Sequence, residues 1–504
     1  MDSSIVPKPI ISQRLNRALA PFEKFFHWAY GMDLNPTYQS GVLAIFFLLI
    51  ALVTGVILLF FYRVGSPYES VLGMHNQWWF AGWLRALHRY SSDAAVVAVV
   101  VHLLRMLVSG RTYGPRTRAW LSGIGVTLLM LFIGLTGLVM IWDEQAQRLA
   151  IAGVQLLDGL TIFSEPPSRI FSSEAQLGTS FFFMLMFMHV ALPLVLVFGL
   201  IFHTSRLSRA KWLPGAPLAV FYGLWLLLLA LMVPAPIGPR ADLSRLPASS
   251  VLDLWYSFWL PLWETLGRGP SVTFWILGLL ILAAVPWFVR TPQDEPRASW
   301  VDENHCTGCT SCYQDCPYEA IQMVQRTVRA DERHSPLVAK VFSDRCVSCG
   351  ICAASCAPMG VGPPGRNGRE QLQELESLLA QHPLRSGQTV VVLACRWGTG
   401  SSQLWHRHPE VRLMPSGCSG SLHTSVFEFL LRRGALGVLV VSCPERDCSH
   451  REGPKWLQQR VLEGRDAPLH TRVDRRRIRI LEMPAVASAE AIQHALDFAG
   501  ELQA

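Results

Sequence analysis

Four histidines in the first 210 residues form two pairs with the same spacing. His88 and His102 lie in one apolar segment and His189 and His203 in another, and 14 positions separate the members of each pair. Fourteen helical residues rise about 21 Å and end roughly 40° short of four full turns, so each pair shares one helix face. Imidazole is well suited to bind haem iron axially. Two such helices side by side would therefore hold two haems stacked across a membrane.

Eight of the 12 cysteines, all of which follow residue 305, form two runs with the spacing C-x2-C-x2-C-x3-C. This spacing is that of bacterial ferredoxins, in which the fourth cysteine of each run binds the other cluster. Zinc sites rarely use eight cysteines in two such runs, and disulfides are disfavoured in a reducing cytoplasm. We predict two 4Fe-4S clusters, one held by Cys306, Cys309, Cys312 and Cys356, the other by Cys346, Cys349, Cys352 and Cys316. We expect the 30-residue insert between the runs to form a hairpin or surface loop.

The last four cysteines lie in a region of alternating helices and buried strands. Strands are predicted at 388–394, 410–414, 436–442 and 477–482. Cys395, Cys418 and Cys443 stand at or just beyond the strand ends, and Cys448 follows in the next loop. Because the carboxyl ends of parallel strands meet at one sheet edge, these thiols should gather there. Scattered free thiols, or thiols that are redox active without metal, remain alternatives.

The segments that must position the histidines are long and apolar. Five runs of about 20 residues are long enough to cross the hydrocarbon, at 41–61, 119–142, 180–203, 217–235 and 271–289. A sixth crossing at about 86–108 contains His88, Asp93, His102 and Arg105, polar groups that are costly in lipid unless a cofactor or partner uses them. The fold class is therefore multidomain, beginning with a bundle of six transmembrane helices.

The loops between these segments differ in charge. The loops 109–118 and 204–212 carry basic residues without an acid, whereas 143–178 is mainly acidic. Basic loops belong in the cytoplasm, so six crossings would leave both termini there. A basic and polar stretch of about 40 residues precedes the first apolar run, so we expect that run to be its own insertion signal. The net charge of +7 is largely explained by these loops and a solvated C-terminal face, and we predict no binding of nucleic acid.

Residues 25–290 resemble cytochrome b of the quinol-oxidising bc-type complexes. The resemblance rests on Arg85, His88, His102, Arg105, His189-Val-Ala-Leu-Pro193 and His203. It implies that His88 and His189 hold the haem b nearer the outer face and that His102 and His203 hold the haem b nearer the cytoplasm. It also implies that Arg85 and Arg105 pair with haem propionates.

Four glycines repeat the 14-residue interval of the histidines, namely Gly41 and Gly55 on one segment and Gly123 and Gly137 on another. Glycine has no side chain, so we expect the haem macrocycle to approach the backbone there. A single intramembrane histidine is often only an interhelical hydrogen bonder, and a single glycine is often a packing site. Four of each at one interval favour haem binding.

The chain departs from the bc-type pattern at the outer quinol site. That family has a Pro-Glu-Trp-Tyr motif, and the best match here is Asp253-Leu254-Trp255-Tyr256. Glu144, Asp253 or Glu264 could substitute for the missing glutamate. Asp93 could relay protons or be paired with a neighbour. We place quinone reduction or oxidation at the cytoplasmic-side haem, beside Thr204 and Ser205.

The C-terminal region resembles the delta subunit of methyl-viologen-reducing hydrogenase. The motifs are Cys395-Arg-Trp, Cys418-Ser-Gly and Cys443-Pro-Glu-Arg-Asp-Cys448. The resemblance implies one 2Fe-2S cluster held by these four cysteines, and electron exchange with a flavoprotein of the heterodisulfide reductase type. The close second cysteine often found after the first is absent here. The predicted domains are a cytochrome b-like domain (1–290), a ferredoxin domain (298–365) and an α/β domain with a mainly parallel sheet (369–504), with Gly360–Gly368 as a flexible connector.

Together these features predict an electron-transfer subunit of the cytoplasmic membrane. It would connect a soluble low-potential oxidoreductase to the quinone pool, with electrons passing between the 2Fe-2S cluster, the 4Fe-4S clusters and the haems in that order or its reverse. Both termini and the Fe-S domains would be cytoplasmic, and a homodimer could form through the membrane domain. Two alternatives are a haem-stabilised membrane anchor for a soluble flavoenzyme complex and electron transfer across the membrane to an external acceptor.

Overall fold

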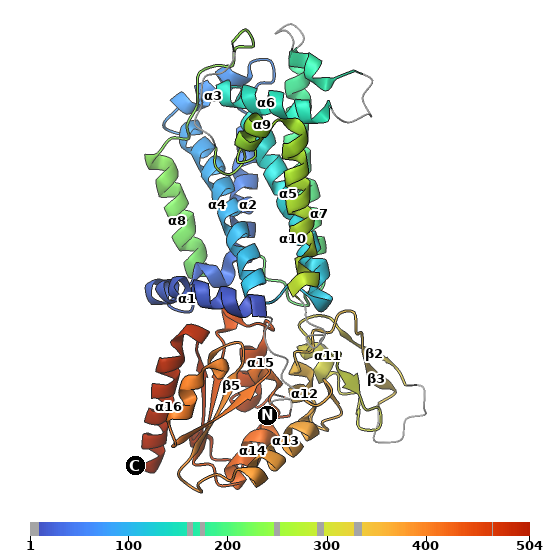
Figure 1. Cartoon of the computed structure of the whole chain (residues 1–504), viewed down its shortest axis with the longest axis vertical. Helices are drawn as coiled ribbons and strands as arrows, with labels where there is room; N and C mark the ends of the chain where they lie inside the picture. Colours follow the sequence, from blue (N-terminus) through green and yellow to red (C-terminus); the bar gives the residue numbers. More distant parts are fainter. Residues whose placement is uncertain are drawn as a thin grey trace.

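The computed structural model describes residues 10–158, 165–171, 177–245, 253–289, 297–326, 335–465 and 467–504. They form an elongated molecule with a helical bundle at one end and a lobe of helices and strands at the other (Figure 1). Residues 290–296, which join the predicted cytochrome b-like and ferredoxin domains, lie outside the described residues.

Five helices of the described chain are long and apolar enough to cross a membrane. They are α2 (Ser40–Leu58), α4 (Ala81–Val108), α5 (Thr117–Val139), α7 (Thr179–Thr204) and α10 (Arg268–Val289). A sixth apolar helix, α8 (Ala216–Met232), has 17 residues, which rise about 26 Å against a hydrocarbon core of about 30 Å. Five of the six predicted crossings are therefore confirmed by length and composition, and the sixth is a slightly shorter helix beside them.

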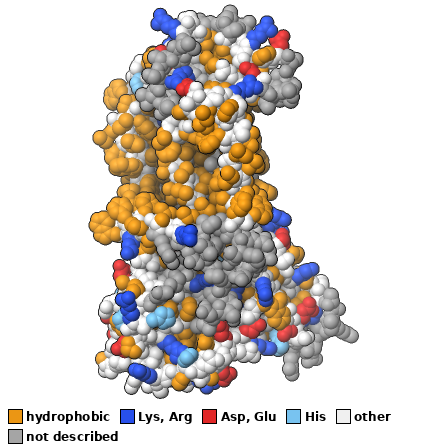
Figure 2. All heavy atoms as spheres, viewed as in Figure 1, with side chains coloured by type: hydrophobic (Ala, Val, Ile, Leu, Met, Phe, Trp, Pro, Cys, Tyr) orange, Lys and Arg blue, Asp and Glu red, His pale blue; other side chains and the backbone are white. Residues whose placement is uncertain are grey.

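On the face drawn in Figure 2, exposed apolar side chains form a belt over the bundle. Phe198 and Phe202 on α7 are 72% and 69% exposed, and Ile281 on α10 is 63% exposed. Soluble proteins rarely expose such continuous apolar surface, whereas lipid accommodates it. The bundle is a transmembrane domain.

Packing divides the bundle into two helix pairs. Helix α2 packs along α4, and α5 packs along α7, while α8 lies against α4 and α10 against α5. Phe47, Leu138, Leu185 and Leu196 are among the buried side chains that join the pairs in one core. The two histidine-bearing helices, α4 and α7, therefore belong to different pairs within a four-helix core.

Further helices close both ends of the bundle. Helix α1 (Ile10–Tyr30) lies across the end next to the lobe, and α3 (Pro67–Asn76), α6 (Glu144–Leu157) and α9 (Leu260–Leu266) lie at the far end (Figure 1). Asp143 caps α6 by accepting a 2.9 Å hydrogen bond from the Ala146 backbone. Its other oxygen accepts from the Gly238 backbone, also at 2.9 Å, and so ties the segment before α9 to α6.

The ferredoxin region contains two small antiparallel sheets and two short helices. Strand β1 (Trp300–Val301) pairs with β4 (Val361–Gly362), and β2 (Ile321–Gln325) pairs with β3 (Leu337–Val341). The predicted hairpin is confirmed in β2 and β3, although 327–334 lie outside the described residues. Gly360–Gly368 was predicted to be a flexible connector, and this was wrong, because β4 and the start of the next helix occupy it.

The C-terminal region is a four-stranded, fully parallel sheet in the order β6-β5-β7-β8. Its strands are β5 (Val390–Cys395), β6 (Val411–Ser416), β7 (Gly437–Ser442) and β8 (Ile478–Glu482), as predicted within two residues. The two short helices of the ferredoxin region are α11 (Ser311–Asp315) and α12 (Ile351–Ser355). The helices around the C-terminal sheet are α13 (Gly368–Gln381), α14 (Thr424–Arg432), α15 (Gly453–Val461) and α16 (Ser488–Gln503). Val391 and Leu393 pack toward α13, α14 and α15, whereas Val390 and Val392 pack toward α16, so helices cover both faces.

Candidate cofactor and metal sites

His88 on α4 and His189 on α7 face each other across the bundle. Their ring centroids lie 6.3 Å apart, with an interplanar angle of 70°. Metal–imidazole bonds are about 2.0–2.1 Å long, as in zinc sites, so one metal ion between two opposed imidazoles requires ring centroids about 6 Å apart. The pair therefore fits bis-imidazole ligation of one haem iron.

Hydrogen bonds orient these imidazoles for ligation. Nδ1 of His88 lies 2.8 Å from the Ala51 carbonyl, and Nδ1 of His189 lies 3.0 Å from the Ile133 carbonyl. A carbonyl oxygen can only accept, so Nδ1 carries the proton and leaves Nε2 with a lone pair for a metal. The same arrangement is typical of metal-binding histidines.

The second pair, His102 and His203, lies one bundle layer nearer the lobe on the same two helices. The two imidazoles interact electrostatically across the bundle. Nδ1 of His203 contacts the Ser122 hydroxyl at 3.0 Å. The structure thus brings all four predicted histidines together in the predicted combinations.

Each of the four spaced glycines lies against one of the four imidazoles. A Cβ atom at Gly41, Gly55, Gly123 or Gly137 would lie 2.8–3.1 Å from Cε1 of His102, His88, His203 or His189, respectively. These glycines were predicted to let the haem macrocycle approach the backbone. The structure gives a different reason for them, because they make room for the histidine rings.

A hydroxyl residue precedes each of these glycines, a signal that the sequence argument missed. The four dipeptides are Ser40-Gly41, Thr54-Gly55, Ser122-Gly123 and Thr136-Gly137. The Thr54 hydroxyl lies 3.1 Å from Nδ1 of His88, and the Thr136 hydroxyl lies 3.1 Å from Nδ1 of His189. The repeated dipeptide therefore places a glycine beside each imidazole ring and a hydroxyl beside Nδ1 of His88, His189 and His203.

The two arginines assigned to propionates have protein partners in this structure. Arg85 binds the carbonyls of Ala235 and Pro236, and its Nη2 lies 3.1 Å from Nδ1 of His75. Arg105 forms a 2.6 Å ion pair with Asp447 of the lobe. Nε of each arginine is buried and has no hydrogen-bond partner among the described residues.

A polar cluster occupies the far half of the bundle, where the outer quinol motif was sought. Arg89 forms ion pairs with Asp253 and, at 3.3 Å, with Asp93. The Tyr256 hydroxyl lies 2.5 Å from the Ser92 hydroxyl. Asp93 thus has a partner through one oxygen, while its other oxygen is buried without one. Glu264, another candidate to replace the missing glutamate of the quinol motif, instead pairs with Arg148 at 2.5 Å.

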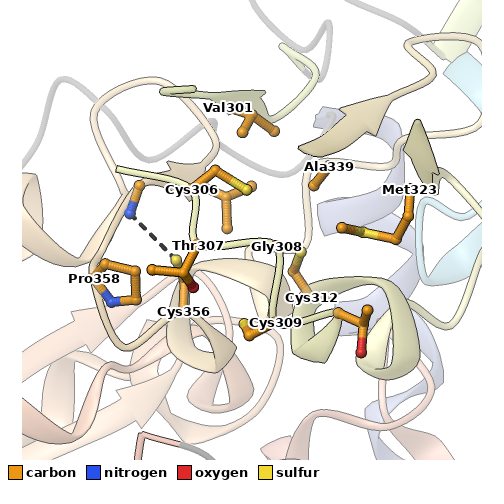
Figure 3. A pocket seen from close by; sticks show the side chains of 13 residues that line it. Val301, Cys306, Thr307, Gly308, Cys309, Cys312, Met323, Ala339, Cys356 and Pro358 are labelled. Carbon is orange, nitrogen blue, oxygen red and sulfur yellow. Dashed lines mark hydrogen bonds between the residues drawn. The ribbon is translucent and has the colours of Figure 1, made fainter. Parts of the chain in front are cut away.

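In the ferredoxin region, four cysteines line each of two cavities of about 350 and 320 Å³. Figure 3 shows the first, around which Cys306, Cys309, Cys312 and Cys356 are arranged. The second is lined by Cys316, Cys346, Cys349 and Cys352. The fourth cysteine of each run thus joins the other run, the exchange expected for two cubane clusters. Within the described ranges, no three Cys, His, Asp or Glu side chains are arranged to hold a single metal ion.

Backbone turns of the same kind shape both cavities. Gly308 and Ser348 occupy equivalent positions in the two cysteine runs, and their φ angles are 74° and 58°. Thr310 and Gly350 are a second equivalent pair, with φ angles of 71° and 80°. Backbone N–H groups point at the sulfurs, with Gly360 N 3.3 Å from Cys356 Sγ and Ala320 N 3.4 Å from Cys316 Sγ. Positive φ at non-glycine residues is strained, so these turns are features that the cluster-binding loops require.

Burial raises the pKa of the Cys349 and Cys352 thiols, and neighbouring cysteines raise it further. Cluster ligands must nevertheless be thiolates, so binding of iron displaces the thiol protons. The N–H groups aimed at the sulfurs would stabilise the resulting negative charge. The donor set and its surroundings therefore fit 4Fe-4S clusters.

The last four cysteines form one buried cluster at the carboxyl edge of the parallel sheet. Cys395 ends β5, and Cys443 directly follows β7. The thiol of Cys443 contacts those of Cys395 and Cys448, and Cys448 contacts Cys418. All four are at most 4% exposed. Four buried thiols gathered at one sheet edge fit a small iron–sulfur cluster.

Comparison with known proteins gives three family matches in the predicted order. Residues 28–211 match the model for cytochrome b/b6/petB, residues 305–360 the 4Fe-4S dicluster domain, and residues 390–504 the methyl-viologen-reducing hydrogenase delta subunit. The resemblances drawn from sequence are confirmed. The cytochrome match ends after α7, so α8 and α10 lie beyond it.

Individual relatives match the membrane region only in part. The cytochrome b subunit of menaquinol:cytochrome c reductase from Geobacillus thermodenitrificans is 23% identical over 142 residues, which are 28% of this chain and 63% of that protein. Cytochrome b6 from Synechococcus sp. (strain JA-3-3Ab) is 31% identical over 113 residues, 22% of this chain and 53% of that protein. The chain thus spans little more than half of the curated relatives it matches. A solved chain titled "Hyperthermophilic respiratory Complex III" has 14% identity and a TM-score of 0.39, covering 55% of this chain and 82% of that one.

Proposed function

We propose that this chain is a membrane electron-transfer subunit linking a low-potential soluble oxidoreductase to the quinone pool. The observation that carries the proposal is the presence of five candidate redox sites in one continuous protein body, two between helices and three in the attached lobe. When bound, haem and iron–sulfur clusters each take up and release single electrons. The cytochrome b and 4Fe-4S matches support this role.

The proposed ligands follow from the geometry. His88 with His189, and His102 with His203, would each hold one haem b. The two ferredoxin cavities would each hold a 4Fe-4S cluster, and Cys395, Cys418, Cys443 and Cys448 would hold a 2Fe-2S cluster. Helices α2 and α5 contribute the glycines that admit the imidazole rings, and the surrounding apolar side chains exclude water from them.

The quinone link is proposed from the relative that is a menaquinol:cytochrome c reductase subunit. We place the quinone beside the haem site of His102 and His203, near Thr204 and Ser205. The outer position is the less favoured one, because Asp253 at the motif is engaged by Arg89. The soluble partner would be a flavoprotein of the heterodisulfide reductase type, as the hydrogenase delta-subunit match suggests.

The side of the membrane follows from charge. The basic loops 109–118 and 204–212 lie on the same side as the lobe, and α1 crosses that end of the bundle (Figure 1). By the positive-inside rule we assign this side to the cytoplasm. Protease added to intact and inverted vesicles tests it, since the lobe should be cut only in inverted vesicles.

The function is tested with the purified full chain. We expect the spectrum of two bis-imidazole haems and EPR signals of reduced iron–sulfur clusters. Menadione added to protein reduced with titanium(III) citrate should oxidise the haems and then the clusters within the same mixing experiment. Haems and clusters that bind but do not exchange electrons would instead indicate a membrane anchor. Oxidation by an external acceptor, with no response to quinones or quinone-site inhibitors, would indicate transfer independent of quinone.

A further inference from the structure

We propose that the loop Cys443–Cys448 docks the C-terminal four-cysteine site directly onto the inner histidine pair, and that Asp447 is the positioning residue. This proposal rests on the proposed function and assigns the order of its sites. The order expected from the sequence put the ferredoxin clusters between the C-terminal cluster and the haems. The contacts place the C-terminal site against both the second ferredoxin cavity and the membrane domain.

The central contact joins Asp447, the neighbour of Cys448, to helix α4. Its carboxylate pairs with Arg105 at 2.6 Å and with Arg111 at 3.3 Å, and Arg111 also donates to the Asp447 backbone carbonyl at 2.8 Å. Arg105 lies one helical turn after His102 on α4. The residue that the cytochrome pattern assigns to a haem propionate therefore holds the loop that carries two of the four thiols.

Further ion pairs attach the same segment to the loop after His203. Glu452 receives three hydrogen bonds from Arg209, at 2.6, 2.9 and 3.0 Å, and Glu445 pairs with Lys211 at 3.1 Å. Arg116 donates to the Ser449 carbonyl at 2.8 Å. The segment 445–452 is thus bound by basic residues from both membrane loops, beneath both histidine-bearing helices.

The C-terminal site also adjoins the second ferredoxin cavity. Arg366 donates to the carbonyl and hydroxyl oxygens of Ser348, at 2.9 and 2.7 Å, and approaches Gly417 beside Cys418. A Cβ at Gly350, next to Cys349, would lie 2.8 Å from Cβ of Ser421, three residues after Cys418. The four-cysteine site therefore lies against both the second ferredoxin cavity and the membrane domain.

A second contact between the lobe and the bundle offers a competing route. Ser208, just after α7, donates to the Cys316 carbonyl at 3.0 Å, so the second ferredoxin cavity also contacts the bundle. In either route one electron leaves a reduced iron–sulfur site and one ferric haem site gains it. The two routes differ in whether the C-terminal cysteines are needed for the ferredoxin to exchange electrons with the haems.

The first test measures the midpoint potential of each haem in Asp447→Asn, without quinone. Loss of an anion beside Arg105 favours the reduced haem, so the potential of the inner haem should shift to a more positive value, with the outer haem unchanged. Asp447→Glu should restore it. The control is Glu376→Gln on α13, whose carboxylate pairs with Arg433 and not with a residue of the membrane domain, and it should leave both potentials unchanged. An unchanged inner potential in Asp447→Asn, with the EPR signal of the C-terminal cluster retained, overturns the role of Asp447.

The second test separates the routes. Protein reduced with titanium(III) citrate is mixed with menadione, while haem absorbance and freeze-quenched cluster EPR are recorded. In Cys443→Ser the haems should oxidise at the wild-type rate, but the ferredoxin signals should persist. In Cys309→Ser, at the first ferredoxin cavity, oxidation of the haems and the C-terminal cluster should be unchanged. Ferredoxin oxidation at the wild-type rate in Cys443→Ser refutes the order, whereas a wild-type protein whose haems never respond to menadione refutes the proposed function.

Discussion

Arg460 of α15 and Asp315 of α11 form a 3.1 Å ion pair, and their side chains are 1% and 0% exposed. One belongs to the C-terminal sheet region and the other to the ferredoxin region. Arg460 also donates to the Ser355 hydroxyl at 2.9 Å, and Arg465 pairs with the second Asp315 oxygen at 2.9 Å. The buried pair joins the two regions into one lobe and fixes the second ferredoxin cavity next to the C-terminal cysteines.

Replacing one member of this pair should loosen the lobe. Arg460→Met leaves the buried Asp315 with Arg465 and the Ser355 hydroxyl as partners among the described residues, and breaking a buried pair typically costs about 3–5 kcal/mol. Chemical unfolding followed by the cluster absorbance measures the change. The control is Arg433→Met, because its exposed pair with Glu376 should contribute roughly 0–1 kcal/mol. Equal losses of stability in both variants would contradict the structural role of the buried pair.

The glycine against His189 should be essential for binding the outer haem. A Cβ at Gly137 would lie 2.8 Å from Cε1 of His189, so Gly137→Val should displace the imidazole and remove one of the two haems. Gly125, on the same helix, has no atom within 4 Å of its Cβ position, and Gly125→Val should retain both haems. Haem content by pyridine haemochrome, with redox titration of the haem that remains, gives the answer. Two haems in Gly137→Val would show that the ring contact is not required.

The exchange of cysteines between the ferredoxin runs predicts which cluster each substitution removes. Cys316→Ser should abolish the cluster at Cys346, Cys349 and Cys352, although Cys316 belongs to the first run. Cys356→Ser should abolish the other cluster. Each variant should lose one of two interacting 4Fe-4S EPR signals, and spin–spin splitting should disappear in both. The paired variant Cys316→Ser/Cys346→Ser discriminates, since it should lose no more iron than Cys316→Ser alone.

Docking of the lobe should weaken in acid. Burial favours a raised pKa of the Glu452 carboxyl, but the hydrogen bonds and charge of Arg209 outweigh it and hold the pKa below the usual value. Lys455 and the Trp456 indole N–H act in the same direction. A lowered folded pKa stabilises the folded state above the unfolded value of about 4.3 and loses that stabilisation as pH falls through the folded value.

We therefore expect the segment 445–465 to become accessible to pepsin or to rapid hydrogen exchange below about pH 4. In Glu452→Gln the segment should be less protected at pH 7, and its protection should change less on acidification. Glu445→Gln is the comparison, since the ion pair of Glu445 with Lys211 is nearly half exposed. An acid transition that is the same in wild type and Glu452→Gln would assign the effect to another group.

Regular spacing was enough to predict most of the architecture. A 14-residue interval on an apolar helix puts both members on one face wherever the helix packs, so His88, His102, His189 and His203 could be paired from their positions. The ferredoxin spacing is equally local, because each run builds its own turns. Continuous apolar runs before Cys395 and Cys443 located the strands, since the strands of a parallel sheet are buried on both faces.

Only the tertiary structure determines which of the candidate redox sites lie next to one another. Asp447 and Arg105 are 342 positions apart in the sequence, and no periodicity relates an acidic loop residue to a particular arginine at a helix end. The contacts of Gly41 and Gly137 with histidine rings were not predicted for the same reason, because a gap left by glycine can admit either a cofactor or a neighbouring ring. Local patterns specify helices, strands and ligand sets, but the contact of the C-terminal cysteine loop with Arg105 depends on packing between regions far apart in the chain.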